Sequence, residues 1–133
     1  MLVELLDELR VRGFPTDQTT LGGFSQGCLM SIEVGIRYPH RFAGIVGISG
    51  RASDPDQLVE ELSPVAMAQR FFITHGTMDP VIPFALAREH VNVLKAAGLR
   101  VEWHELVKAH TIAGEDELEL IRDFVRHGYE RSG

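Results

Sequence analysis

The chain of 133 residues contains a single cysteine, Cys28, so no disulfide bond can form within it. Its first residues, Met-Leu-Val-Glu-Leu-Leu-Asp-Glu, have neither the basic start nor the long apolar stretch of a signal peptide. No apolar run approaches the ~20 residues that a membrane-spanning helix needs. We therefore expect a cytoplasmic protein without stable membrane insertion, because a reducing compartment suits a lone free thiol.

An excess of basic charge is also missing. The chain has 13 Lys and Arg against 19 Asp and Glu, a formal net charge of −6 at pH 7. Because nucleic acids and anionic membranes attract cationic surfaces, neither is expected as the main partner. No cluster of His, Cys, Asp or Glu has metal-ligand spacing, and there is no glycine-rich phosphate loop. We expect no metal and no cofactor.

The composition that is present is typical of one packed domain. Hydrophobic residues make up 44% of the chain and charged residues 24%, which favours a folded core over disorder. The length corresponds to one domain at most, and no repeat, linker or low-complexity tract interrupts it. We treat residues 1–133 as a single domain.

The most informative segment is Gly-Phe-Ser-Gln-Gly at residues 23–27, a G-x-S-x-G pattern. A β-favouring stretch precedes it, and a helix-length segment that stops at Pro39 follows it. Strand, sharp turn and helix are the context in which this pattern presents a serine nucleophile. We expect a strained backbone at Ser25, and we expect any side chain at Gly23 or Gly27 to collide with its surroundings.

Hydrophobic patterning predicts strands that alternate with helices. Strands are expected at about 18–24, 42–48, 70–74 and 101–106. Helices are expected at the N-terminus up to Gly13, then at about 28–38, 54–62 and 84–98, and last after residue 114 with Leu118, Ile121 and Val125 inward. This alternation predicts an α/β fold with about four parallel strands and helices on both faces of the sheet.

A serine hydroxyl needs a histidine to accept its proton and an acid to orient that histidine. In the α/β-hydrolase order, the acid and then the histidine follow the serine, on loops after later strands. Asp79 follows the 70–74 strand, and His110 lies in the loop after the 101–106 strand. We therefore predict Ser25 as nucleophile, Asp79 as acid and His110 as base.

Other candidate residues receive a different interpretation. His75 also ends a strand, but it precedes the acid, so we expect it to shape the Asp79 loop. The remaining histidines lie away from the expected active edge of the sheet: His40, His90, His104 and His127. Cys28 is interpreted as a small packing residue under the turn, and the run Glu115-Asp116-Glu117 as a solvated helix start.

Catalysis of this kind also requires an oxyanion hole, formed by N–H donors that face the developing negative charge. The backbone N–H of Gln26, directly after the nucleophile and at the helix N-terminus, is the expected first donor. The second donor normally comes from a loop after an earlier strand. No such loop is found, because the strand before Ser25 is the first in the sequence.

Four segments together make the chain resemble the phospholipase/carboxylesterase family, which includes the acyl-protein thioesterases: residues 21–27, 48–50, 75–83 and 110–112. The resemblance implies the same three residues, Ser25, Asp79 and His110, and hydrolysis of carboxylic esters or thioesters without metal or cofactor. Ala109 stands where the family usually has glycine. The resemblance covers only the C-terminal part of the family's longer chains, which implies a truncated α/β-hydrolase without the early strands.

Three hypotheses about function follow from this resemblance. The first is a serine carboxylesterase of reduced activity, acting on small or activated esters, that forms a homo-oligomer through the open edge of its sheet. The second is a non-catalytic remnant whose open edge binds another chain. The third is one half of a split enzyme, completed by a partner chain that carries the missing strands.

Overall fold

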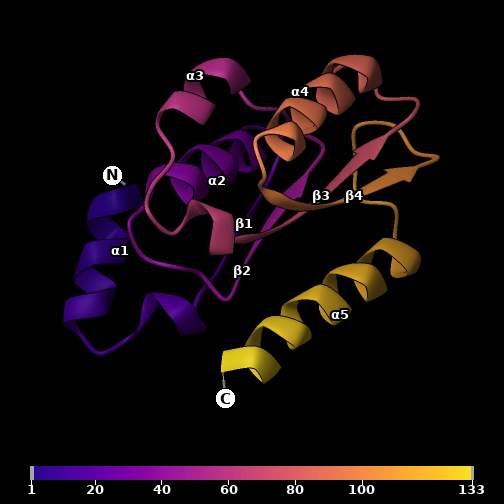
Figure 1. Ribbon diagram of the computed structural model, residues 1–133. Helices are drawn as coiled ribbons and strands as arrows, with labels where there is room; N and C mark the ends of the chain where they lie inside the picture. The colour runs from indigo at the N-terminus through magenta and orange to yellow at the C-terminus, as the bar shows by residue number, and fades with distance from the viewer. Residues whose placement is uncertain (1, 133) are drawn as a thin grey trace.

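A computed structural model describes residues 2–132, and its strands form one parallel sheet (Figure 1). The strands are paired in the order in which they follow one another along the chain: β1 (Thr20–Phe24), β2 (Gly44–Ile48), β3 (Arg70–Gly76) and β4 (Arg100–Leu106). This confirms the predicted four-stranded parallel sheet. Because every strand runs in the same direction, the loops that follow the strands all lie at one edge of the sheet.

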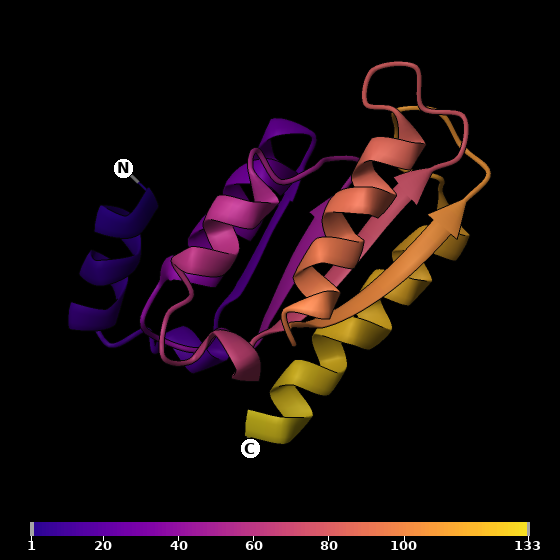
Figure 2. The same ribbon diagram turned by 45° about the horizontal axis from the view of Figure 1, so that its top comes forward.

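The helices cover both faces of this sheet, as predicted. Figure 2 shows α2 and α4 on one face and α5 on the other. The described α-helices are α1 (Leu2–Val11), α2 (Gln26–Arg37), α3 (Pro55–Glu60), α4 (Phe84–Ala96) and α5 (Glu115–Ser132), with short 3-10 turns at Thr16–Gln18 and Ala66–Ala68. Within residues 2–132, no helix combines the length and the apolar character needed to cross a bilayer.

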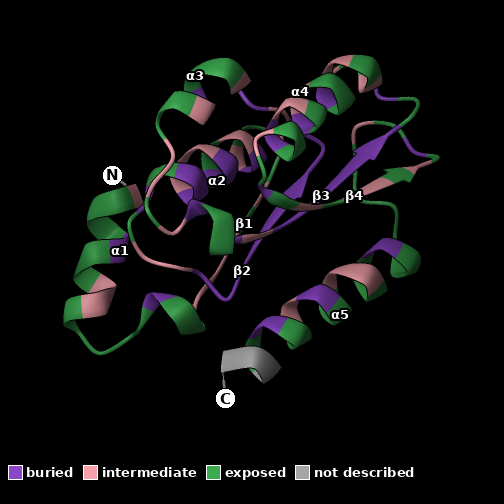
Figure 3. Ribbon diagram, viewed as in Figure 1, coloured by how far each residue is buried: buried purple, intermediate pink, exposed green. Residues whose placement is uncertain are grey.

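Side chains alternate between the two faces of β2 and β3, and this alternation divides the core. Ile45, Phe71 and Ile73 belong to a cluster that the helices α1 to α4 cover. Val46 and Phe72 point to the other face, where they pack against α5. Every residue of β2 is therefore buried (Figure 3), as its continuous apolar run predicts.

The inward face of α5 differs from the predicted one. Phe124 is 6% exposed and Glu117 is fully buried, whereas Leu118 is 36% exposed. Ile121 and Val125 are partly buried against the sheet, as expected. Glu117 and Phe124 are seven residues apart, so they share one face of the helix. The interpretation of Glu117 as part of a solvated helix start is wrong, and so is the inward position of Leu118.

The strand before Ser25 lies at the end of the sheet. Within the described part of the chain, β1 pairs with β2 alone, so its other side faces no strand. Phe24, the last residue of β1, is 39% exposed. Leu6 of α1 packs into the core on the face of the sheet that α2 covers. The helix α1 therefore does not pair with the free side of β1.

The junction between β1 and α2 is as tight as the G-x-S-x-G pattern predicts, but only one of its two glycines explains this. A Cβ atom on Gly23 would overlap the carbonyl group of Gly27, which is a backbone contact that cannot move aside. A Cβ on Gly27 would meet nothing within 4 Å. The expected collision is therefore correct for Gly23 and wrong for Gly27, whose backbone, and not its side-chain position, fills the space.

This asymmetry predicts opposite effects for two alanine substitutions four residues apart. Gly23→Ala should lower the free energy of unfolding by about 3 kcal/mol, because strand and helix must separate to admit a methyl group. Gly27→Ala should be neutral, or should stabilise the fold by up to ~1 kcal/mol, because alanine favours the helix more than glycine does. Urea unfolding of both variants measures the difference, and equal losses would contradict the described junction.

Candidate active site

Ser25 occupies the turn between β1 and α2 in a backbone conformation that few residues adopt. Its φ of 59° and ψ of −113° lie outside the regions that L-residues favour. Its N–H donates to the carbonyl of Ile48 at 2.9 Å, and its carbonyl accepts from the N–H of Leu29 at 3.2 Å. These bonds hold the strained residue between strand and helix, and the side chain lies at the carboxyl edge of the sheet.

The structure brings together the three residues that the sequence selects. Nε2 of His110 lies 2.9 Å from Oγ of Ser25. Nδ1 of His110 lies 2.8 Å from Oδ2 of Asp79. The Asp79 side chain is fully buried, while the His110 side chain is 15% exposed. The sequence separations are large, and the shared edge of the parallel sheet is what makes these residues neighbours.

The environment of Asp79 keeps its carboxylate charged. Its Oδ1 accepts hydrogen bonds from the N–H groups of Val81 at 2.8 Å and Ile82 at 2.9 Å. Burial acts to raise the pKa of Asp79, but these bonds and the one with His110 outweigh it and hold the pKa below its ordinary value. Beside a carboxylate, Nδ1 of His110 carries the proton, which leaves Nε2 free to accept from the Ser25 hydroxyl.

His75 lies beside this group and takes a different place in it. It is fully buried in β3, its Nε2 lies 2.9 Å from the carbonyl oxygen of Ile82, and the same atom is 3.4 Å from Oδ2 of Asp79. A bond from this ring N–H fixes the turn whose N–H groups hold Asp79. His75 therefore shapes the loop, in the position that the sequence suggests.

The N-terminus of α2 faces the same edge of the sheet. Gln26 directly follows Ser25 and is the first residue of the helix. The first N–H groups of an α-helix have no partner within the helix, and the helix dipole is positive there. The backbone N–H of Gln26 is the donor beside Ser25 that the sequence predicts.

A groove with a volume of about 660 Å³ opens beside Ser25. Most of its wall is apolar, and polar groups come from the serine and two further side chains. The lining residues are Phe24, Ser25, Gln26, Leu29, Arg51, Val81 and Ile82. Sequence reasoning missed Leu29, Arg51, Val81 and Ile82 as lining residues, although each lies in the first turn or loop after a strand at this edge.

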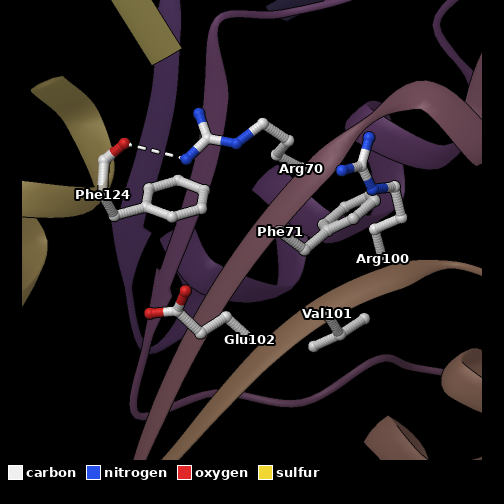
Figure 4. Close-up of a pocket in the computed structure, with 6 residues that line it drawn as sticks. All are labelled: Arg70, Phe71, Arg100, Val101, Glu102 and Phe124. Atoms are coloured by element: carbon white, nitrogen blue, oxygen red, sulfur yellow. Dashed lines mark hydrogen bonds between the residues drawn. The ribbon is translucent and has the colours of Figure 1, made fainter. Parts of the chain in front are cut away.

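A second hollow, of about 400 Å³, lies where β3 and β4 begin, away from the strand ends that carry Ser25, Asp79 and His110. Figure 4 shows the side chains that line it. Its residues include Arg70 and Arg100, which begin β3 and β4. The guanidinium group of Arg70 donates to the carbonyl oxygens of Ala43 and Phe124 and lies 4.2 Å from the centre of the Phe124 ring. Arg70 therefore stabilises the packing of α5 against the sheet. The hollow is not part of the Ser25 site.

Cys28 is confirmed as a packing residue under the turn. It is fully buried, and burial raises the pKa of its thiol to about 12. A Cβ on Gly47 or Gly50 would lie 2.6 or 2.7 Å from its sulfur. The thiol therefore fills the space between α2 and β2 and stays protonated, which excludes it as a nucleophile. Among the described side chains, those of residues 2–129, no three of His, Cys, Asp or Glu gather in a way that could hold a metal ion.

A buried ion pair holds the loop that carries His110. Nζ of Lys108 lies 2.9 Å from both carboxylate oxygens of Glu117 and 2.7 Å from the carbonyl oxygen of Thr111. The side chains are 3% and 0% exposed. Since His110 lies between Lys108 and Thr111, the bond from the ammonium group to Thr111 stabilises the loop on both sides of the histidine.

Glu117 completes this network. Besides Lys108, it accepts hydrogen bonds from the N–H of Ala113 and the hydroxyl of Thr74. Burial acts to raise the pKa of Glu117, but the hydrogen bonds and the Lys108 charge outweigh it, so the pKa lies below its ordinary value. The network joins α5 and the His110 loop to β3, which explains why this acidic residue is not solvated.

Replacing one residue of the Lys108–Glu117 pair should lower the free energy of unfolding more than replacing both residues with apolar ones. Glu117→Gln or Lys108→Met leaves one charged or polar group buried without its partner, and each should lower the free energy of unfolding by about 3–5 kcal/mol. The double variant Lys108→Met with Glu117→Leu should recover part of that loss, because no unpaired charge stays buried, although Thr74 and Ala113 lose an acceptor and Thr111 a donor. Urea unfolding measures all three.

A surface pair provides the control for this experiment. Glu8 on α1 and Arg12 just after it are 57% and 68% exposed, and Glu8→Gln should change the free energy of unfolding by less than ~1 kcal/mol. A double variant as unstable as the single ones would contradict the network as described.

Comparison with known proteins places this geometry in a family. A family model described as Phospholipase/Carboxylesterase matches residues 1–128. The chain is 41% identical over 93 residues to acyl-protein thioesterase 1 of Schizosaccharomyces pombe, covering 70% of this chain and 42% of that protein. It is 31% identical over 128 residues to acyl-protein thioesterase 1 of Yarrowia lipolytica, covering 93% of this chain and 56% of that protein.

A solved structure supports the same fold. The crystal structure of Arabidopsis thaliana SOBER1 superposes with a TM-score of 0.90 at 21% identity, covering 96% of this chain and 61% of that one. The chain spans about half the length of the two acyl-protein thioesterases, with 42% and 56% of each covered. The fold is therefore that of an α/β-hydrolase, represented here over part of its length.

Proposed function

The chain belongs to the phospholipase/carboxylesterase family, and we propose that it is a serine hydrolase that cleaves carboxylic esters or thioesters. The observation that carries the proposal is the run of two hydrogen bonds from Asp79 through His110 to Ser25. A serine in this arrangement is a nucleophile with a base at hydrogen-bond distance and an acid that orients the base. The relatives named acyl-protein thioesterase 1 support the thioester alternative.

The geometry supports a reaction in two halves. Oγ of Ser25 attacks the carbonyl carbon of the ester while Nε2 of His110 takes the hydroxyl proton. Asp79 stays ionised and stabilises the imidazolium ion, and the N–H of Gln26 donates to the oxyanion of the tetrahedral intermediate. The intermediate collapses, His110 gives its proton to the leaving alcohol or thiol, and the acyl group stays on Ser25.

The second half repeats these steps with water. His110 takes a proton from the water that attacks the acyl-serine, and it returns the proton to Oγ as the carboxylic acid leaves. Each step uses only side chains, main-chain N–H groups and water, so we propose no metal and no cofactor.

We propose that turnover is slow and favours small or activated esters. Only one oxyanion donor, the N–H of Gln26, is assigned, and the loss of one such donor costs about 10²–10³ in turnover. An activated leaving group depends less on that stabilisation, because less charge must accumulate before the bond breaks. We also place the protein in the cytoplasm as a proposal, based on its single buried cysteine.

A non-catalytic remnant and a split enzyme are the competing functions. Neither is favoured by an observation of its own, and a remnant would not be expected to keep all three residues within hydrogen-bond distance. A fluorophosphonate probe separates the possibilities. Labelling of Ser25 in the purified chain supports the hydrolase, whereas labelling only after a partner chain is added supports the split enzyme.

Substitution of the nucleophile tests the proposed reaction. Ser25→Ala should reduce hydrolysis of p-nitrophenyl butyrate to the rate of the buffer, because Ser25 is the serine whose hydroxyl is hydrogen-bonded to Nε2 of His110. Ser53→Ala is the control, since Ser53 is exposed and its hydrogen bonds to described residues are those with Glu33. Initial rates at matched protein concentration give the comparison. A Ser25→Ala variant that hydrolyses the ester as fast as the parent protein would contradict the proposal.

We further propose that the open edge of β1 pairs two copies of the chain. Unpaired backbone groups at a sheet edge invite another strand, and the partly exposed Phe24 adds apolar area there. Sedimentation velocity should show a species of twice the monomer mass at micromolar concentration. A single monomer boundary across the whole concentration series would argue against this association.

A further inference from the structure

Arg51 lies in the wall of the groove beside Ser25, and Gly50 shows how close its backbone comes to the turn. A Cβ on Gly50 would lie 2.7 Å from the carbonyl oxygen of Ser25. The residue before Arg51 is therefore packed against the backbone of the nucleophile. Arg51 follows at once, and its side chain is partly buried where Leu29 and Ile82 also line the groove.

Among the side chains that the structure describes, none is an acidic partner of the Arg51 guanidinium group. Over the described residues, its one hydrogen bond runs from Nη1 to the carbonyl oxygen of Ala52 at 3.1 Å, and no carboxylate forms an ion pair with it. The nearby Glu33 bonds with Arg37 and Ser53, and Asp54 caps α3. Since arginine has five N–H donors, most of those on Arg51 remain available to a ligand.

The surroundings strengthen the attraction of Arg51 for an anion. No other residue named in the groove wall is charged, and four of the seven are apolar: Phe24, Leu29, Val81 and Ile82. A cation against apolar walls is partly desolvated, so a charge-assisted hydrogen bond recovers more free energy there than on an open surface. The chain as a whole carries a net charge of −6, so the attraction is local to the groove.

We propose that Arg51 makes this site selective for esters that carry an anionic group, a carboxylate or a phosphate, close to the scissile bond. The proposal rests on the proposed hydrolysis at Ser25 and adds the chemical class of its substrate. The apolar residues accept the hydrocarbon part of the ester, and the planar guanidinium fork binds the anion through two parallel hydrogen bonds. A neutral ester of the same shape leaves those donors unpaired.

Two esters of nearly the same shape but different charge test this selectivity. One is para-(butyryloxy)benzoate and the other is para-(butyryloxy)benzamide, so the acyl group and the ring are the same and the scissile ester is the only ester bond in each. The quantity measured is the ratio of kcat/KM for the anionic ester to kcat/KM for the neutral one, since a ratio cancels changes in the reaction itself. A third ester, para-(butyryloxy)phenyl phosphate, distinguishes a preference for phosphate from one for carboxylate.

Arg51→Met should lower this ratio by about 10-fold or more, because it removes the charge-assisted hydrogen bonds to the anion. Arg51→Lys should keep part of the ratio, as a charge without the planar fork. Added salt should lower the ratio of the parent protein by screening the charge. Arg122→Met is the control, because Arg122 is 60% exposed on α5, outside the groove, and should keep the parent ratio.

The outcomes separate this proposal from the function on which it rests. Serine-dependent hydrolysis with the same ratio in the parent protein and Arg51→Met would overturn the role of Arg51 and leave the hydrolase intact. An absence of serine-dependent hydrolysis of every ester would overturn both. If Arg51→Met does not fold, Arg51→Lys and the salt dependence decide, and a ratio that neither changes overturns the proposal.

Discussion

The close approach of β1 and α2 at Gly23 is the constraint on which the site depends. Because the strand and helix backbones touch there, the turn between them must be sharp, and Ser25 is held at a φ of 59°. The parallel order of the sheet then places the turns after β2 and β3 and the loop after β4 at the same edge. Each supplies a different part of the site: Gly50 and Arg51, Asp79, and His110.

The strands that carry Ser25 and His110 lie at opposite sides of the sheet, and this separation explains the buried Lys108–Glu117 ion pair. His110 lies on a loop after the fourth strand, three strands from β1, and a loop of that kind needs support to hold a side chain within hydrogen-bond distance. Lys108 and Glu117 supply this support from inside the protein, together with Thr74 on β3. A buried ion pair contributes little net stability, so its value here lies in fixing one loop conformation.

Sequence reasoning predicted the parts of the structure that leave a local pattern. Strand and helix periodicity located the four-stranded sheet, and motif order selected Ser25, Asp79 and His110, which the structure brings together. Glu117 was misjudged because its partners are distant or hidden in a loop, and an acidic helix start is ordinarily solvated. The prediction for Gly27 was wrong for a similar reason. The G-x-S-x-G pattern shows that glycines occur at both positions, but it does not show at which of them a Cβ atom would collide with the backbone.

We propose that His110, oriented by Asp79, activates Ser25 as a nucleophile. The rate at which a fluorophosphonate phosphonylates Ser25 measures this most directly, because it reports nucleophilicity without turnover or product release. We expect His110→Gln to lower this rate on the order of 10³-fold or more while the variant stays folded. An equal rate in the parent protein and His110→Gln, with both folded, would contradict it.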